Sequence, residues 1–332
     1  MGLPKVAFIG TGGTISSLGA DSLDIIHYGD QKSMLTADQI LARVPEAAAV
    51  ADVVPVPFVA VPSPDMAFQQ WKDLSVCCDR LVTEHPDLAG IVIGHGTATL
   101  EETAYALSLG LDIEIPVVMT GSQRPLAGLS SDAGLNLVNA LRTAAAPESR
   151  GRGVLVLLND EIHAARDVTK TATTRLHTFQ TRDFGILGHV DGPCLRYYRR
   201  SERLAGPGTG FHLSTMVELP RVDIAYAYAG CDAAAVEAFV AAGARGVVSA
   251  GLAPGNTTQA QRAALERAVT AGVVVVQSTR AGSGVVHLGA GLQAAGFLSA
   301  DNLTPQKARI LLAFALSSTT DHAEIARIFA TC

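Results

Sequence analysis

Strand-like apolar runs alternate with helix-like amphipathic segments along most of this chain, and this alternation restricts its fold more than any other feature. The runs KVAFIG, LAGIVIGHG, IPVVMTGSQ and GVLVLLND are almost continuously apolar. Residues 65–85 lie between the first two of these runs, and in them Phe68, Trp71 and Leu74 recur at helical spacing. Residues 36–47, TADQILARVPEA, have the same spacing. Continuous apolar strands separated by helices predict a parallel sheet covered on both faces.

The alternation is interrupted once, between residues 197 and 213. This segment, YYRRSERLAGPGTGFHL, is rich in Arg, Gly and Pro and has no period. A second series of strand-like and helix-like segments follows it, and a chain of 332 residues is long enough for two domains. We therefore expect two α/β domains with mostly parallel sheets, a larger one at 1–196 and a smaller one at 214–332, joined by a linker at 197–213.

The composition and residue spacing argue against nucleic-acid binding, a metal site and a membrane span. The net charge is −6 and long charge runs are absent, which disfavours nucleic acid as a partner because phosphate binding needs a basic surface. The five cysteines contain no C-x-x-C pair, and the nine histidines form no H-E-x-x-H or H-x-H pair, so a metal site has little support. No apolar stretch reaches the length of a membrane span and no signal peptide is visible, so a cytoplasmic location is expected.

Three polar clusters follow strand-like runs. They are GTGGTISS, GHGTATLEE and NDEIHAARDVTKTATT. Because the carboxyl ends of parallel strands meet at one edge of a sheet, we expect the three clusters to lie at a common edge. This edge is therefore the predicted location of the functional site.

Each cluster alone leaves alternatives open. A dinucleotide-binding fingerprint starting at Gly10 would need glycine at position 15, where Ile15 stands, so the first cluster is either an ordinary tight turn or one that presents Thr11 or Thr14. Lys170 lies among threonines, where a lysine with a lowered pKa can serve as a base for a hydroxyl nucleophile. The alternative for Lys170 is an ordinary solvated lysine.

In combination the segments resemble the bacterial-type L-asparaginase/glutaminase family. The family signature A-T-G-G-T-I is matched by GTGGTI apart from Gly10 in its first place. The signature H-G-T-D-T-x-E-E-T is matched by HGTATLEET in every place but one. Further similar segments follow in order along nearly the whole chain: VVMTGSQRP, SSDAGLNL, ARDVTKTATT, SAGLAPGN and LTPQKARILL.

The resemblance implies an assembly and an activity. It implies a homotetramer built as a pair of tight dimers, with each site placed between the N-terminal domain of one subunit and the C-terminal domain of its neighbour. It also implies hydrolysis of a side-chain amide to an acid and ammonia, with no metal or other cofactor. The partner of such a chain is a small-molecule amide.

Four residues match the family's catalytic positions. Thr14 matches its nucleophilic threonine, and Tyr28 matches the tyrosine of its flexible lid with a spacing that differs by one. Thr97 matches the second catalytic threonine, and Lys170 matches the lysine. These roles agree with the chemistry, because an alkyl hydroxyl is a poor nucleophile until a base takes its proton. The Gly-rich and Thr-rich turns can supply the backbone N–H donors that a tetrahedral oxyanion needs.

The substrate-binding positions match less completely. Ser63 and Asp65 match an S-x-D that holds the substrate's α-carboxylate and α-ammonium, and Asn256 matches a residue lent by the neighbouring subunit. Ala98, however, stands where the family has an aspartate that contacts the α-ammonium. A subunit-crossing glutamate facing the same ammonium is also missing, because residues 280–299 contain no acid.

These departures lead to three hypotheses. The first is an amidohydrolase that hydrolyses a linear or cyclic amide lacking the usual free α-ammonium. The second is an L-asparaginase weakened by Ala98, and the third is a non-catalytic small-molecule sensor on the same scaffold. Retention of Thr14, Tyr28, Thr97 and Lys170 argues against the sensor, which has no need of two threonines and a lysine.

Overall fold

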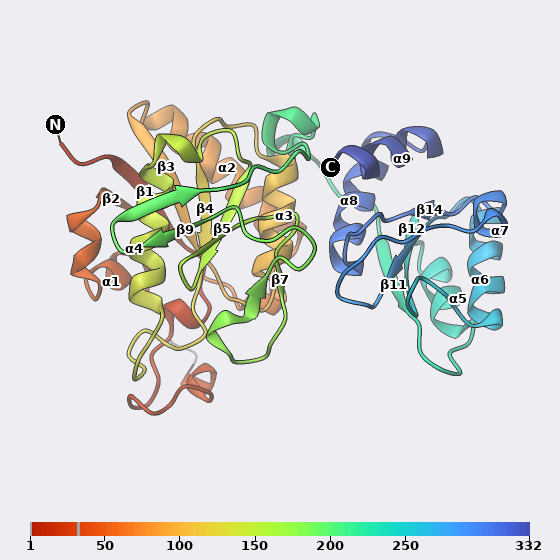
Figure 1. Ribbon diagram of the computed structural model, residues 1–332, viewed down its shortest axis with the longest axis horizontal. Helices are drawn as coiled ribbons and strands as arrows, with labels where there is room; N and C mark the ends of the chain where they lie inside the picture. Colours follow the sequence, from red (N-terminus) through yellow and green to blue (C-terminus); the bar gives the residue numbers. More distant parts are fainter. Residues whose placement is uncertain (1, 32–33) are drawn as a thin grey trace. The chain divides into compact units, whose positions relative to one another are not determined.

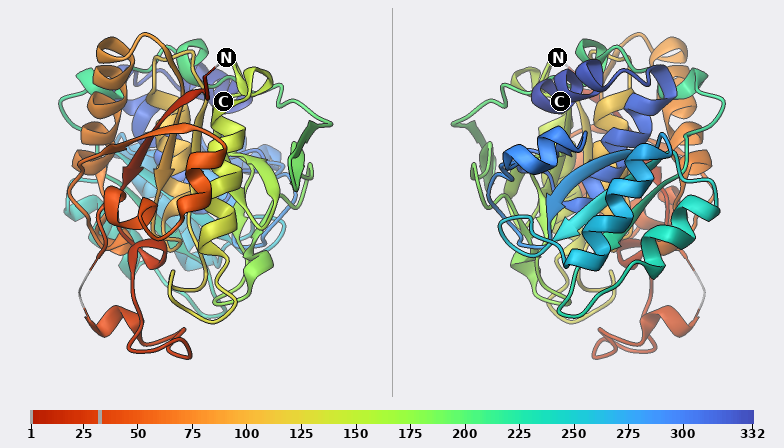
Figure 2. Two further views of the ribbon diagram at one scale, coloured as in Figure 1. Left: turned by 90° about the vertical axis from the view of Figure 1, so that its left-hand side faces the viewer. Right: turned by 90° about the vertical axis from the view of Figure 1, so that its right-hand side faces the viewer.

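The computed structural model describes residues 2–31 and 34–332 and separates into two compact units, Met1–Thr215 and Met216–Cys332. Each unit is an α/β fold built around its own sheet, with eight strands in the first and four in the second (Figures 1 and 2). Both sheets are mostly or wholly parallel, so the predicted fold class is confirmed. The segment expected as a linker, 197–213, lies within the first unit, where the Thr209 hydroxyl donates to the Leu109 carbonyl at 2.5 Å.

The first sheet has a parallel body and an antiparallel edge. Strands β2, β1, β3, β4 and β5 are parallel neighbours, and β6, β9 and β10 extend the sheet from β5 in antiparallel pairs. In sheet order the strands are β10 (Cys194–Tyr197), β9 (Gly188–Asp191), β6 (Glu161–Ala164), β5 (Val154–Leu158), β4 (Val117–Thr120), β3 (Leu88–Gly94), β1 (Lys5–Gly10) and β2 (Asp52–Val56).

Helices cover both faces of this sheet. The helices are α1 (Ala37–Leu41), α2 (Phe68–Glu84), α3 (Leu100–Gly110) and α4 (Ala133–Ala145). Apolar residues of α1 and α4 share one buried cluster with the strands, whereas α2 and α3 pack together on the opposite face (Figure 1). Burial on both faces explains why the central strands are continuously apolar.

The helix expected over residues 36–47 is much shorter. Helix α1 ends at Leu41, and a separate 3-10 helix begins at Pro45. Proline has no N–H to donate and disfavours helical geometry in the residue before it, so the periodic segment cannot continue as one helix.

The third polar cluster begins directly after the parallel strand β5, as expected, but it is not a single loop, because its residues 161–164 form strand β6. Asn159 and Asp160 have positive φ angles of 52° and 65° and turn the chain back from β5 into antiparallel β6. Two successive positive φ values are typical of a type I′ hairpin turn. The chain then reaches a two-stranded ribbon of β7 (Thr169–Lys170) and β8 (Phe179–Gln180).

The second unit has a four-stranded parallel sheet. Its order is β11 (Val222–Tyr226), β12 (Gly246–Gly251), β13 (Val274–Thr279) and β14 (Leu298–Ser299). Its helices are α5 (Ala234–Ala241), α6 (Gln259–Thr270), α7 (Ala290–Ala294), α8 (Pro305–Ser318) and α9 (His322–Thr331). Apolar residues of β11, β12, β13, α5 and α6 form one buried cluster.

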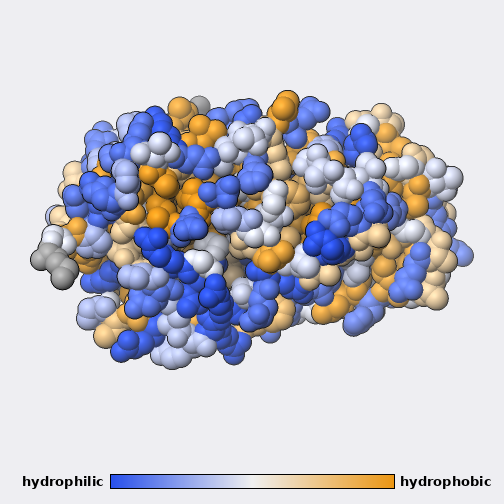
Figure 3. All heavy atoms as spheres, turned by 90° about the horizontal axis from the view of Figure 1, so that it is seen from above, coloured by the Kyte–Doolittle hydropathy of each residue, from blue (hydrophilic) through white to orange (hydrophobic). Residues whose placement is uncertain are grey.

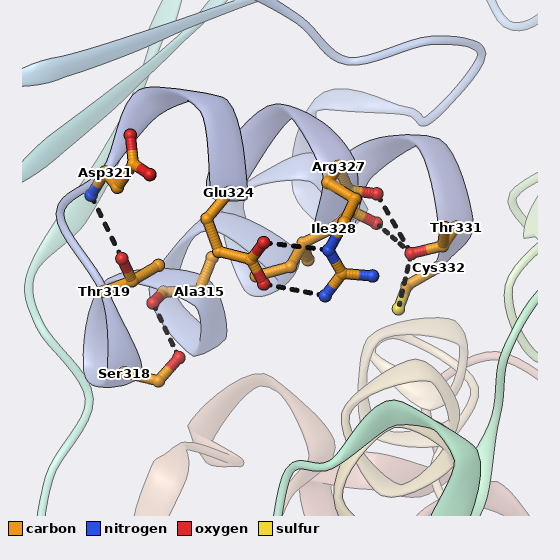
Figure 4. A network of polar contacts seen from close by, with 9 residues as sticks. All are labelled: Ala315, Ser318, Thr319, Asp321, Glu324, Arg327, Ile328, Thr331 and Cys332. Atoms are coloured by element: carbon orange, nitrogen blue, oxygen red, sulfur yellow. Dashed lines mark hydrogen bonds and ion pairs between the residues drawn. The ribbon is translucent and has the colours of Figure 1, made fainter.

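Helix α9 is defined by local polar contacts at both ends. The Asp321 carboxylate accepts from the Ala323 N–H at 3.1 Å and caps the helix. One turn on, Arg327 forms a two-pronged ion pair with Glu324 at 2.7 and 2.8 Å, and the Thr331 hydroxyl donates to the Arg327 carbonyl (Figure 4). These contacts stabilise the end of the chain as a helix.

The surface is mixed in character. Hydrophobic and hydrophilic residues are interspersed over the face drawn in Figure 3. Within the described part of the chain, none of the helices combines the length and the hydrophobicity that a membrane crossing requires.

Candidate active site

Three turns meet at the carboxyl ends of the central strands of the first unit. Gly13 follows β1, Gly96 follows β3, and Ser63 begins a 3-10 turn, Ser63–Asp65. A Cβ added to Gly13 would overlap the Gly96 Cα, and one added to Gly96 would lie 2.6 Å from the Ser63 Oγ. The Gly13 and Gly96 backbones are therefore in direct contact, and Gly96 packs against the Ser63 side chain, which brings the residues next to the glycines together.

Thr14 is paired with Tyr28. Thr14 opens a 3-10 turn after Gly12 and Gly13, whose φ angles of 105° and 85° favour glycine. Its hydroxyl lies 2.8 Å from the Tyr28 hydroxyl, at hydrogen-bonding distance. The Thr14 side chain is buried, and Tyr28 is partly exposed.

Thr97 is paired with Lys170. The Lys170 Nζ donates to the Thr97 Oγ1 at 2.7 Å, and Thr97 is only 6% exposed. Burial lowers the pKa of Lys170, and the negative charge of Glu101 partly opposes this effect. A lysine with a lowered pKa is a larger fraction neutral near neutral pH, and a neutral amine can accept a hydroxyl proton. The solvated-lysine alternative does not describe this partly buried side chain.

The three remaining predicted positions of the first unit differ in exposure. Ser63 is buried, and its carbonyl accepts from the Thr99 hydroxyl at 2.6 Å. Asp65 ends the same 3-10 turn and is exposed. Ala98 is also exposed, in the turn directly after Thr97.

Asn256 belongs to the second unit and lies in the loop after β12. Its backbone N–H donates to the Leu252 carbonyl at 2.6 Å, and its carbonyl accepts from the Leu252 N–H at 2.7 Å. These two bonds close a tight turn that contains the cis Ala253–Pro254 peptide. The turn places Asn256 at the carboxyl end of the second sheet.

Sequence comparisons agree with this geometry. The family model described as Asparaginase, N-terminal matches residues 5–203, and the model described as Glutaminase/Asparaginase C-terminal domain matches residues 221–329. The chain belongs to the asparaginase/glutaminase family. The family assignment made from the motifs is thereby confirmed, and the chain is an asparaginase-family amidohydrolase.

Several members of the asparaginase/glutaminase family are similar to this chain over nearly its full length. A probable periplasmic L-asparaginase of Haemophilus influenzae is 38% identical over 98% of this chain and 93% of its own. A glutaminase-asparaginase of Pseudomonas fluorescens is 34% identical over 98% of this chain and 90% of its own. The crystal structure of a probable cytoplasmic L-asparaginase from Campylobacter jejuni is similar with a TM-score of 0.94 and 33% identity, covering 99% of each chain.

The structure adds one acidic residue to the asparaginase-family site that sequence reasoning left without a role. Glu101 lies in the first turn of α3, is 6% exposed, and contacts the strand that carries Lys170. The sequence feature that places Glu101 near the site is its position four residues after Thr97, at the start of the helix that follows the signature turn.

His95, just before the signature turn, is a core residue. Its side chain is completely buried, and burial lowers its pKa to about 4. The imidazole is therefore neutral at pH 7, and its Nδ1 donates to the Gly96 carbonyl at 2.8 Å. Elsewhere in the described ranges, no group of three or more His, Cys, Asp or Glu side chains is arranged to hold a metal ion.

Proposed function

We propose that this chain hydrolyses a small-molecule amide, linear or cyclic, through a threonine nucleophile, and that its substrate lacks the usual free α-ammonium. The observation that carries the proposal is the pairing of two threonine hydroxyls with separate proton-handling groups beside an uncharged Ala98. A site that only binds ligand needs neither pairing, which argues against the sensor.

The Thr97–Lys170 pair illustrates the proposed chemistry. The threonine oxygen attacks the amide carbon while its proton moves to the neutral amine of Lys170. The resulting ammonium returns that proton to the nitrogen as the C–N bond breaks, so a threonine ester remains. A linear amide releases ammonia or an amine, and in a cyclic amide the amine stays attached to the acyl group. Water then cleaves the ester, which releases the carboxylic acid and restores the hydroxyl.

The Thr14–Tyr28 pair offers a second hydroxyl for the same two steps. A tyrosine hydroxyl both donates and accepts hydrogen bonds, so Tyr28 can pass on its own proton as it receives that of Thr14. Backbone N–H groups of the touching Gly13 and Gly96 turns are suitable donors for the oxyanion.

Ala98 supports a substrate without an α-ammonium. Residue 98 is exposed in the single chain, and in the proposed tetramer a neighbouring subunit would cover the site. An ammonium buried there without a carboxylate partner costs about 3–5 kcal/mol, so an asparagine-like molecule should bind poorly. Ser63 retains a hydroxyl that can donate to a carboxylate, and the exposed Asp65 offers a carboxylate. The competing candidate is an L-asparaginase weakened by Ala98, in which Asp65 compensates.

The assembly and the location are part of the same proposal. We infer a homotetramer, a dimer of dimers, in which Asn256 contributes to a neighbouring subunit's site, as the family resemblance implies. A cytoplasmic location is proposed from the sequence. Relatives of this chain include a probable cytoplasmic L-asparaginase and a probable periplasmic one.

The test measures ammonia release from asparagine, glutamine and succinamate, amine release from a panel of N-substituted amides, and ring opening of a panel of cyclic amides. We expect turnover of an amide without an α-ammonium to exceed that of asparagine. Introducing Ala98→Asp should raise asparagine kcat/KM at least about tenfold, equivalent to about 1.4 kcal/mol. Ala98→Asn, which has a similar size but no charge, is the matched control and should not.

The outcomes separate the candidates. Efficient asparagine turnover by the unaltered protein contradicts the substrate proposal and favours the weakened asparaginase. Tight binding of one amide without turnover of any favours the sensor.

A further inference from the structure

Glu101 is a buried carboxylate that the reaction scheme does not use. It lies in the first turn of α3 (Leu100–Gly110), four residues after Thr97, and only 6% of its surface is exposed. Burying a carboxylate is costly unless hydrogen bonds or opposite charges compensate for lost water. Its contacts therefore indicate why an acid is placed there.

Those contacts hold the strand that carries Lys170. One carboxylate oxygen, Oε1, accepts from the Thr169 hydroxyl at 3.0 Å and from the Lys170 backbone N–H at 3.1 Å. Strand β7 consists of these two residues alone and pairs only with the two residues of β8 within the described sheets. Such a short ribbon is not stable by itself, so an anchor on α3 decides where the lysine side chain starts.

The charge of Glu101 also acts on the Lys170 amine. Burial lowers the pKa of Lys170, and Glu101 is the charged group that opposes this shift. Among the described residues in contact with Lys170, Thr97 is the hydroxyl partner of the amine, and Phe179 and Gln180 of the paired strand β8 do not titrate.

Two further ionic groups lie on the same segment as Lys170. Arg166 and Asp167 form an ion pair at 3.0 Å, so their charges largely offset each other. The carboxylate that remains to balance the ammonium form of Lys170 is therefore Glu101.

We propose that Glu101 is the positioning residue for Lys170: it fixes strand β7 against α3 and supplies the negative charge that the side chain at position 98 does not. The inference rests on the proposed function, in which Lys170 receives the threonine proton. Without Glu101 the amine is both less firmly held and more easily deprotonated.

The test follows the lysine amines directly and needs no substrate. The chain has five lysines, so protein carrying 13C at lysine Cε gives a simple NMR spectrum, and Lys170→Met identifies the Lys170 signal. Its titration is compared in the unaltered protein, Glu101→Gln and Glu102→Gln. The Glu101→Gln variant removes the charge but retains a side-chain carbonyl that can accept from the Thr169 hydroxyl and the Lys170 N–H. Glu102→Gln is the matched control, because it removes a neighbouring carboxylate from the same helical turn.

We expect Glu101→Gln to move the Lys170 midpoint to lower pH by about one unit, the size of effect of a nearby opposite charge. Glu102→Gln should leave it in place. An unchanged or raised midpoint in Glu101→Gln overturns the proposal, as does an equal shift in both variants.

Activity supplies the positioning readout. Glu101→Ala should lower kcat at least about tenfold, with a smaller change in KM, on whichever amide is turned over. Glu101→Gln should recover most of the lost kcat. It should also move the acid limb of the pH profile to lower pH. An acid limb that stays in place overturns the proposal. If no amide is hydrolysed by the unaltered protein, the proposed function fails, and the NMR titration still decides the Glu101–Lys170 coupling.

Discussion

At the scale of single residues, the site combines groups that are reactive because of where they are buried. Lys170 is hydrogen-bonded to Thr97, and its partial burial lowers the pKa of its amine and so favours the neutral form. His95, two positions before Thr97, is buried completely and is also kept neutral. The same physical effect therefore prepares one residue for proton transfer and makes the other a pH-dependent part of the core.

His95 predicts a loss of stability in acid. Its folded pKa of about 4 lies below the ordinary value of 6.5, so between these pH values the unfolded chain binds a proton that the folded chain does not. Stability should fall as pH decreases from 6.5 to about 4, by about 3 kcal/mol from this residue. Urea denaturation gives the free energy of unfolding of the unaltered protein and of His95→Gln at each pH. The difference in unfolding free energy between the two proteins should shrink on acidification, and a constant difference would contradict the prediction.

At the scale of elements, the close approach of the turns after β1 and β3 determines the site. Thr14 and Thr97 occupy their positions because Gly13 and Gly96 have no side chains to separate the two backbones. The contact with Ser63 adds a third segment, whose carbonyl is held by the Thr99 hydroxyl.

Gly96→Ala should therefore inactivate the protein. The new Cβ would lie 2.6 Å from the Ser63 Oγ and 2.7 Å from its Cβ, so the turns must separate. We expect a destabilisation of about 1–3 kcal/mol and a loss of ammonia release larger than that destabilisation explains. Gly208→Ala is the control, because its Cβ would meet Leu204 at an ordinary 3.6 Å. Equal behaviour of the two variants in thermal unfolding and turnover would refute the argument.

The sequence predicted these elements unevenly, for physical reasons. Strands β1, β3, β4 and β5 were recognisable because burial on both faces makes them continuously apolar. The hairpin after β5 was missed, although Asn159 and Asp160 are residue types that tolerate positive φ. The role of Glu101 could not be predicted from the residues alone, because its bonds to Thr169 and Lys170 join positions almost 70 residues apart.

At the scale of the whole molecule, the two units carry different parts of the proposed site. Thr14, Tyr28, Thr97 and Lys170 all belong to the first unit, and Asn256 belongs to the second. In the proposed tetramer, Asn256 acts on a neighbouring subunit, so assembly and turnover should be linked.

Light scattering should accordingly give about four times the chain mass of 34.4 kDa. Asn256→Ala should keep that mass, because the backbone turn between Asn256 and Leu252 does not need the Asn256 side chain. The same variant should lower turnover of the best amide. A fully active monomer would contradict the proposed assembly.

The confinement of both hydroxyl pairs to the first unit has an evolutionary consequence. Residues 14 to 170 contain the two threonines, the tyrosine and the lysine, together with the Glu101 anchor. The acid-free segment at 280–299, which includes α7 and β14, lies in the second unit, so new side chains in its connecting loops need not alter any of those bonds. The substrate contacts proposed for Ser63, Asp65 and Ala98 lie in the same unit as the hydroxyl pairs. It is therefore the part of substrate choice carried by the second unit that a lineage can change while those pairs remain unchanged.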